Sequence, residues 1–146
     1  MNSICMFTPS ADGGHALYAQ ELMTALCAPP RPPRQMKFEL VSSENLHPEF
    51  RCGQYDIHPI LPALLDRRQI GSRLGWVANR VMHYPRREMT FLKWLRGRPD
   101  IGAVHFQEWT PWLAAPLFRR IRKMGKKIFY TVHNVVPHKY PKYVPK

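Results

Sequence analysis

Residues 4–15 read ICMFTPSADGGH, a short apolar run followed by a turn and two glycines, Gly13 and Gly14. The apolar run predicts a buried strand, and the residues behind the glycines predict a helix. Glycines at such a corner let backbone N–H groups approach an anion, and the helix amino terminus adds unpaired donors. The turn therefore suits a phosphate, although a strand–glycine–helix corner also forms for geometric reasons alone. Neither a GxGxxG pattern nor the lysine of a P-loop is present.

The next segment completes a strand–helix–strand unit. Residues 15–27 carry leucines and alanines at helical spacing, and the proline-rich run 28–34 ends that helix. Residues 36–41 form a second apolar run, bounded by serines. A strand, a helix and a strand within about 40 residues have the size of a βαβ unit, whose two strands are parallel.

The rest of the chain extends this pattern. We predict an irregular segment over 44–69, two amphipathic helices separated by Pro85, a strand over 101–106, a helix over 112–124 and a strand over 127–132. This order of elements predicts the α/β class. We expect a Rossmann-like doubly wound parallel sheet, in a single domain over residues 1–146.

The charge of the chain is high and uneven. The formal net charge is +12, of which residues 1–50 carry −2 and residues 51–146 carry +14. A surface this positive favours anionic partners, such as nucleic acid, an anionic membrane face or a phosphorylated substrate. The three cysteines have no CxxC spacing, which predicts reduced thiols instead of a zinc site or a disulfide framework. No apolar run has the length of a membrane span.

Three polar clusters follow predicted strands. They are the Gly13-Gly14 turn, residues 105–109 (HFQEW) and residues 131–134 (TVHN). Ligands of doubly wound sheets bind beyond the carboxyl ends of the strands, so these clusters form the candidate site. His133 could orient a substrate hydroxyl or transfer a proton, or it could be an ordinary hydrogen-bonding loop histidine. Gln107 and Glu108 could bind the hydroxyl groups of a sugar, or only water.

The two helices predicted around Pro85 combine apolar faces with many arginines. Arg73 and Arg80 fall opposite the apolar face of the first helix, and Arg86 and Arg87 fall on the polar side of the second. A charge run of this kind is most often a solvated face. Because aromatic residues lie among the cations, the surface also fits docking to an anionic membrane or to nucleic acid. No zinc-finger or RNP motif accompanies it.

Three motifs follow one another along the chain: Gly13-Gly14-x-x-x-Tyr18-x-x-x-Leu22, Val104-His105-Phe106-Gln107, and Thr131-Val132-His133-Asn134-Val135-Val136-Pro137-His138. Together they resemble the N-terminal half of the family 4 retaining glycosyltransferases, and the likeness covers essentially the whole chain. Those enzymes have the GT-B architecture, in which two Rossmann-like domains face a cleft. The resemblance thus implies the same fold class as the order of elements.

The resemblance implies a role for each matching residue. The substrate-binding residues would be Gly13, Gly14, His15, Gln107 and Asn134, and the catalytic residue would be His133. The two glycines would approach the diphosphate of the donor, and His133 would lie near the transferred sugar and the acceptor. No metal or other cofactor is implied, and the chain has no Asp-x-Asp motif. Lys139 stands where the family often has a glutamate, so that position receives no role.

The resemblance also implies partners. The donor would be a sugar nucleotide, and the acceptor would be the hydroxyl group of a glycan, a lipid-linked sugar or another molecule, with transfer in retention. We expect the C-terminal donor-binding domain to be absent from this chain and supplied as a missing domain or a separate subunit. The chain alone should then be inactive. Its expected location is the cytoplasm, either free or peripheral on the cytoplasmic face of a membrane.

Two other classes of protein stay open. One is a non-catalytic basic binding module for an anionic membrane or nucleic acid. The other is a different nucleotide-dependent Rossmann enzyme. Glu44, near the end of the second predicted strand, lies close to where such enzymes carry the acidic residue that binds a ribose.

Overall fold

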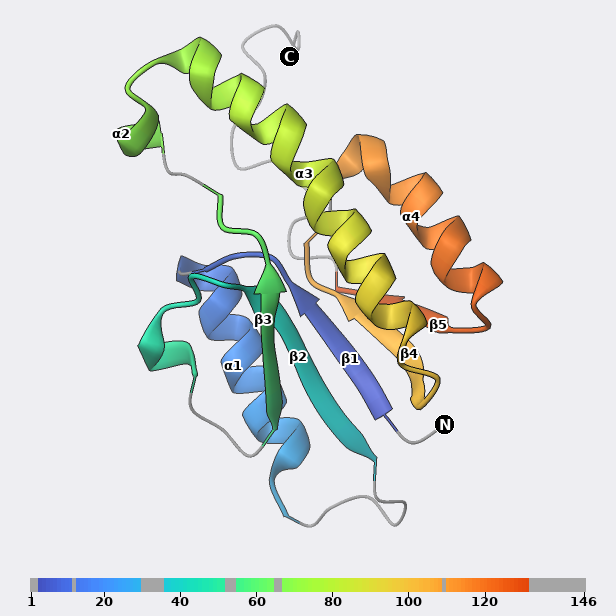
Figure 1. Cartoon of the computed structure of the whole chain (residues 1–146). Helices are drawn as coiled ribbons and strands as arrows, with labels where there is room; N and C mark the ends of the chain where they lie inside the picture. Colours follow the sequence, from blue (N-terminus) through green and yellow to red (C-terminus); the bar gives the residue numbers. More distant parts are fainter. Residues whose placement is uncertain are drawn as a thin grey trace, which may run out of the picture.

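A parallel sheet forms the centre of the molecule (Figure 1). The computed structural model describes residues 3–11, 13–29, 36–51, 55–64, 67–108 and 110–131. Within these ranges, one five-stranded sheet has the order β3-β2-β1-β4-β5, and each neighbouring pair is parallel. The strands are β1 (Ser3–Thr8), β2 (Lys37–Ser43), β3 (Asp56–Leu61), β4 (Ile101–Phe106) and β5 (Lys127–Tyr130).

Helices cover both faces of the sheet. They are α1 (Gly13–Cys27), the short α2 (Arg67–Ile70), α3 (Arg73–Arg96) and α4 (Pro111–Lys123), with a 3-10 turn η1 (Pro48–Phe50). Ala19 and Met23 of α1 pack in a core on one face, with Phe38 and Leu40 of β2. On the other face, α3 and α4 pack against the sheet in a second core, which is rich in aromatic residues. Helices on both faces of a parallel sheet confirm the predicted Rossmann-like doubly wound fold.

The strand β3 lies within the segment predicted to be irregular, so that prediction was wrong there. Its sequence, DIHPIL, contains Pro59, which cannot donate a backbone hydrogen bond to a neighbouring strand. Among the described strands, β3 lies at the edge of the sheet and pairs with β2 alone. At an edge, a proline can leave its donor-less side facing away from the sheet. A proline therefore did not exclude a strand here.

The helix α3 is continuous, whereas the sequence predicted two helices separated by Pro85. Ser72 begins it as the N-cap, and its hydroxyl accepts a hydrogen bond from the Gly75 N–H at 3.1 Å. Pro85 removes the donor for the carbonyl of Val81, but Val81 is on the exposed side of the helix, where water can bind that carbonyl. Packing of the carboxyl-terminal half into the core, through Phe91 and Leu95, then supports the helix beyond the proline.

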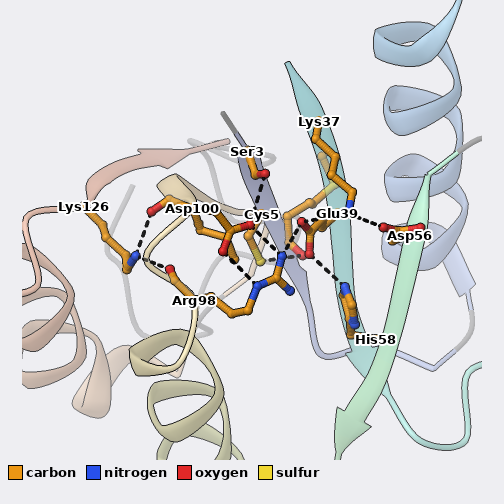
Figure 2. A network of polar contacts seen from close by, with 11 residues as sticks. Ser3, Cys5, Lys37, Glu39, Asp56, His58, Arg98, Asp100 and Lys126 are labelled. Atoms are coloured by element: carbon orange, nitrogen blue, oxygen red, sulfur yellow. Dashed lines mark hydrogen bonds and ion pairs between the residues drawn. The ribbon is translucent and has the colours of Figure 1, made fainter. Parts of the chain in front are cut away.

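An ion cluster ties together the starts of four strands at the amino edge of the sheet (Figure 2). Glu39 of β2 is fully buried, and its carboxylate accepts hydrogen bonds from Arg98 Nη2 at 2.6 Å and from His58 Nε2 at 2.8 Å. Arg98 also binds Asp100 at 2.8 Å. Burial alone would raise the pKa of Glu39, but the hydrogen bonds from Arg98 and His58 outweigh it and hold that pKa below its usual value.

The strand over 101–106 has its predicted bounds, while the last strand ends at Tyr130 and Thr131 already lies outside it. Cys5 and Cys27 are both buried. In the part of the chain that the structure describes, no helix combines the length and apolar character needed to cross a membrane.

Candidate functional site

The candidate site lies at the carboxyl edge of the sheet, between β1 and β4. These two central strands connect to opposite sides of the sheet, and the loops that follow them therefore diverge and leave a crevice. Ser10 follows β1 and Glu108 follows β4. The Ser10 N–H donates to Glu108 Oε1 at 2.9 Å, which fixes the two loops to each other.

Two adjoining cavities open at this crevice, and we call them together the carboxyl-edge groove. The polar pocket, of about 460 Å³, is lined by the β1–α1 loop, the loops on either side of β3 and the amino-terminal half of α3. The apolar pocket, of about 110 Å³, extends between α3 and α4 and is lined by aromatic rings. Four residues line both pockets: Pro9, Tyr84, Arg87 and Glu108.

Arg87 is the most unusual residue of the groove, because it is a buried cation. The residue is only 3% exposed. Its Nη2 donates to the carbonyl of Pro9, while among the described residues its Nε donates to no partner and its guanidinium forms no ion pair. Burial lowers the pKa of Arg87 to about 10, although the charge of Glu108 partly opposes this. A buried cation without an ion pair would be stabilised by an anion bound in the groove.

A second arginine, Arg80, lies about two helical turns before Arg87 and lines the polar pocket. Its Nη1 donates to the Tyr84 hydroxyl at 3.2 Å, and its guanidinium lies 5.2 Å from the centre of the Trp76 ring. The rings of Trp76 and Tyr84 hold this guanidinium in place by cation–π contact. Among the described residues that line it, the polar pocket thus carries two cations and one carboxylate, that of Glu108.

Glu88 lines the apolar pocket beside Thr110. Burial raises the pKa of its carboxyl group to about 7, although a hydrogen bond with Thr110 and the charge of Arg120 lower it in part. The carboxyl group is therefore close to half protonated near neutral pH. It can donate as well as accept a hydrogen bond in the pocket.

The raised pKa of Glu88 predicts a pH-dependent stability. The unfolded carboxyl has a pKa near 4.5, so between that pH and about 7 the folded state holds the extra proton. This stabilisation is complete below pH 4.5 and is lost as the pH rises through about 7. Glutamine does not titrate, so the free energy of unfolding of Glu88→Gln, relative to that of the native chain, should rise as the pH rises. Between pH 5 and pH 8 the rise should be about 1 kcal/mol in urea unfolding, a figure that is reduced because the side chain is partly exposed. The same substitution at the exposed Glu21 is the matched control, and it should change the free energy of unfolding by less than about 0.5 kcal/mol. A constant difference for Glu88→Gln would contradict the prediction.

The glycine turn adjoins the groove without lining it. Gly13 begins α1 with a φ of +73°, a conformation that L side chains rarely adopt, which accounts for glycine at this position. At Gly14 a side chain would meet nothing within 4 Å, so neither backbone strain nor packing requires a glycine there. Both glycines are exposed, and His15 next to them is half-buried. None of the three is among the residues that line the two pockets.

Gln107 is buried and lies apart from the groove. Its amide Nε2 is 2.9 Å from the sulfur of Met6, which belongs to the core under α1, on the opposite face of the sheet from α3. Its Oε1 has no hydrogen-bond partner in the described ranges. The neighbouring His105 is half-buried, and its Nε2 lies 2.7 Å from the hydroxyl oxygen of Thr131. The second predicted cluster is thus divided. Glu108 lines the groove, whereas the side chain of Gln107 contacts the core on the face of the sheet that α1 covers.

The third predicted cluster is described only at its first residue, Thr131. His133 and Asn134 lie outside the described residues, as does Trp109. Trp112, at the start of α4, is 65% exposed and lines the apolar pocket. Glu44 is exposed, and its Oε1 accepts from the Ala63 N–H at 2.9 Å, so this carboxylate caps the loop behind β3.

The sequence prediction missed Arg87 as a site residue and placed it on the polar side of a helix, which was wrong. Arg87, Phe91 and Leu95 are spaced four residues apart, so in one continuous helix they lie on one face. Phe91 and Leu95 are fully buried, and Arg87 is buried with them. The spacing was therefore a usable signal, but the helix break predicted at Pro85 concealed how the face continues.

The described residues contain no group of three or more His, Cys, Asp or Glu side chains that could hold a metal ion. Comparisons of the chain with models of protein families, with curated proteins and with solved structures gave no significant match.

Proposed function

We propose that this chain is the acceptor-side, N-terminal domain of a glycosyltransferase that uses a sugar nucleotide. The observation that carries the proposal is the buried guanidinium of Arg87 at the switch point of a doubly wound sheet. A phosphate oxygen would supply the ion pair that Arg87 lacks among the described residues. Arginine forms short, strong and often bidentate hydrogen bonds to phosphate.

The polar pocket has the size and charge for such a group. A volume of about 460 Å³ is within the usual range for small-molecule sites. Arg80 and Arg87 would face the diphosphate from α3, and the Ser10 and Ala11 backbone would face it from the β1–α1 loop. The open amino terminus of α1, with Gly14 free of packing constraints, adds favourable charge nearby. Glu108 supplies an acceptor for a ribose or sugar hydroxyl.

The motif resemblance supports the sugar-transferring form of this proposal. In that reading the diphosphate leaves the donor while cations stabilise its developing charge. The sugar passes to an acceptor hydroxyl with retention of its anomeric configuration. Arg87 and Arg80 are this chain's candidates for that stabilisation. His133 remains our candidate for the group beside the transferred sugar. A second domain would close the other side of the groove, and the chain by itself should not transfer sugar.

The test is a titration of the isotope-labelled chain with pyrophosphate, UDP-glucose and GDP-mannose, followed by amide and arginine side-chain NMR signals. The expected result is saturable shifts at Ser10, Ala11 and the Arg87 Nε–H. If a second domain contributes the rest of the site, as proposed, the affinity of this chain alone should be weak, with a Kd on the order of 1 mM.

Two outcomes would overturn the proposal. One is a set of shifts confined to exposed arginines, such as Arg119 and Arg122, with the groove signals unmoved. The other is tight, steeply salt-dependent binding of an oligonucleotide that sugar nucleotides do not affect, which would identify a nucleic-acid-binding module. Efficient sugar transfer by the chain alone would contradict only the expected inactivity.

A further inference from the structure

The amino-terminal half of α3 carries an exposed apolar stripe. The stripe consists of Leu74, Val77, Val81 and Met82, which are 81%, 43%, 58% and 71% exposed. Leu74, Val77 and Val81 are three and four residues apart, and Met82 follows Leu74 by eight residues, so all four lie on one side of the helix. Large aliphatic side chains exposed singly are common on protein surfaces, but a contiguous row marks a surface that binds something.

The position of the stripe explains why it is exposed. This half of α3 extends past α4 and beyond the carboxyl edge of the sheet (Figure 1). Further along the same side of the helix, Leu92 is buried in the core with Leu117 and Ile121 of α4. The side of α3 that α4 covers in the carboxyl-terminal half of the helix thus continues into the amino-terminal half, where no other described element covers it.

The segment of the chain that contains the stripe carries charge of one sign. Residues 67–87 contain six arginines and no aspartate or glutamate. Arg73 and Arg86 are exposed, and their positions in the helix place them on the two flanks of the stripe. The apolar side chains of the stripe would fit an apolar layer, and the arginines beside them would fit negatively charged groups above that layer. An anionic membrane has this arrangement.

We propose that the amino-terminal half of α3 docks on an anionic membrane surface. The stripe enters the boundary between headgroups and acyl chains, and Arg73 and Arg86 bind lipid phosphates. The groove side of α3 carries Arg80 and Tyr84 in this half and Arg87 just beyond it. Docking therefore holds the groove next to the membrane surface, within reach of a lipid-linked hydroxyl. The inference does not depend on the proposed sugar transfer.

Co-sedimentation with vesicles tests this proposal. The vesicles contain phosphatidylcholine and phosphatidylglycerol in equal parts, or phosphatidylcholine alone. The native chain should bind the anionic vesicles, bind neutral ones weakly, and lose affinity as salt rises. The double substitution Leu74→Glu, Met82→Glu should weaken binding to anionic vesicles at least about tenfold, because it places two anions in the stripe. The matched control Leu17→Glu, Leu26→Glu, on exposed positions of α1, should change binding less than about twofold.

A second variant and three contrary outcomes keep the test decisive. Arg73→Glu, Arg86→Glu should also weaken vesicle binding, and both variants should keep the native unfolding midpoint, since all four side chains are exposed.

No binding of the native chain to anionic vesicles would overturn the proposal. So would binding that the stripe variant leaves unchanged while arginine reversal abolishes it, since that is charge attraction alone. Dimerisation in solution that the stripe variant abolishes would assign the stripe to a second copy of the chain instead. Pyrophosphate shifts at the groove should persist in the stripe variant, so the two proposals can fail separately.

Discussion

Arg87→Met should weaken pyrophosphate binding by about 10- to 100-fold without destabilising the fold. The loss corresponds to one or two hydrogen bonds between charged groups. Stability should hold or rise because methionine fills a similar volume and removes a buried charge that has no ion pair among the described residues. The measurements are an NMR titration and urea unfolding of the same two proteins.

The chain provides a matched control for this prediction at the preceding residue. Arg86→Met removes the same charge from an exposed position and should change pyrophosphate affinity less than about twofold. Arg87→Lys should recover part of the affinity, because lysine keeps the charge but not the planar fork of donors. Equal losses from Arg86→Met and Arg87→Met would show that net charge, and not the groove, binds the anion.

Glu39→Ala should lower the free energy of unfolding by about 3 kcal/mol, the largest loss of stability that we expect from the amino-edge ion cluster. The substitution removes the carboxylate that binds both Arg98 and His58 (Figure 2). It also empties a fully buried position near the amino-terminal end of β2. This value is at the low end of the range for removing one partner of a buried ion pair, because Arg98 keeps Asp100 as a partner. Urea unfolding at neutral pH measures it.

Two comparisons separate charge from volume at this position. Glu39→Gln keeps the shape, so its loss reports the charge, whereas Glu21→Gln on the exposed side of α1 should cost under about 0.5 kcal/mol. The pKa of Glu39 is lowered in the fold, so its stabilisation is present above about pH 4.5 and is lost as the pH falls through the folded value. The native chain should therefore lose more stability in acid than Glu39→Gln does. Equal acid sensitivity of the two proteins would contradict this assignment.

Much of the fold could be predicted because local patterns and topology agree. The apolar run over 101–106, flanked by Pro99 and a polar loop, predicted the bounds of β4 correctly. The glycine pair behind β1 predicted the start of α1 to within two residues. Alternation of strands and helices then leaves few arrangements other than a parallel sheet with helices on both faces.

Two prolines caused the main errors, because a proline has different effects in different surroundings. Pro59 is compatible with a strand only because β3 lies at the edge of the sheet. Pro85 is compatible with a helix because its side of α3 is exposed and the helix beyond it is held by the core. Neither the edge position nor the packing of α3 is visible in the sequence around the proline.

The sequence by itself determined the class of fold, the excess of positive charge and the edge of the sheet where a ligand would bind. These depend on periodicity, composition and strand order, which are local or additive properties. Only the tertiary structure decided which cation is exceptional, because burial depends on what packs around a residue. Among the arginines of α3, Arg87 shares a face with Phe91 and Leu95 and is carried with them against the sheet. Its neighbour Arg86, one residue earlier and chemically identical, remains in solvent.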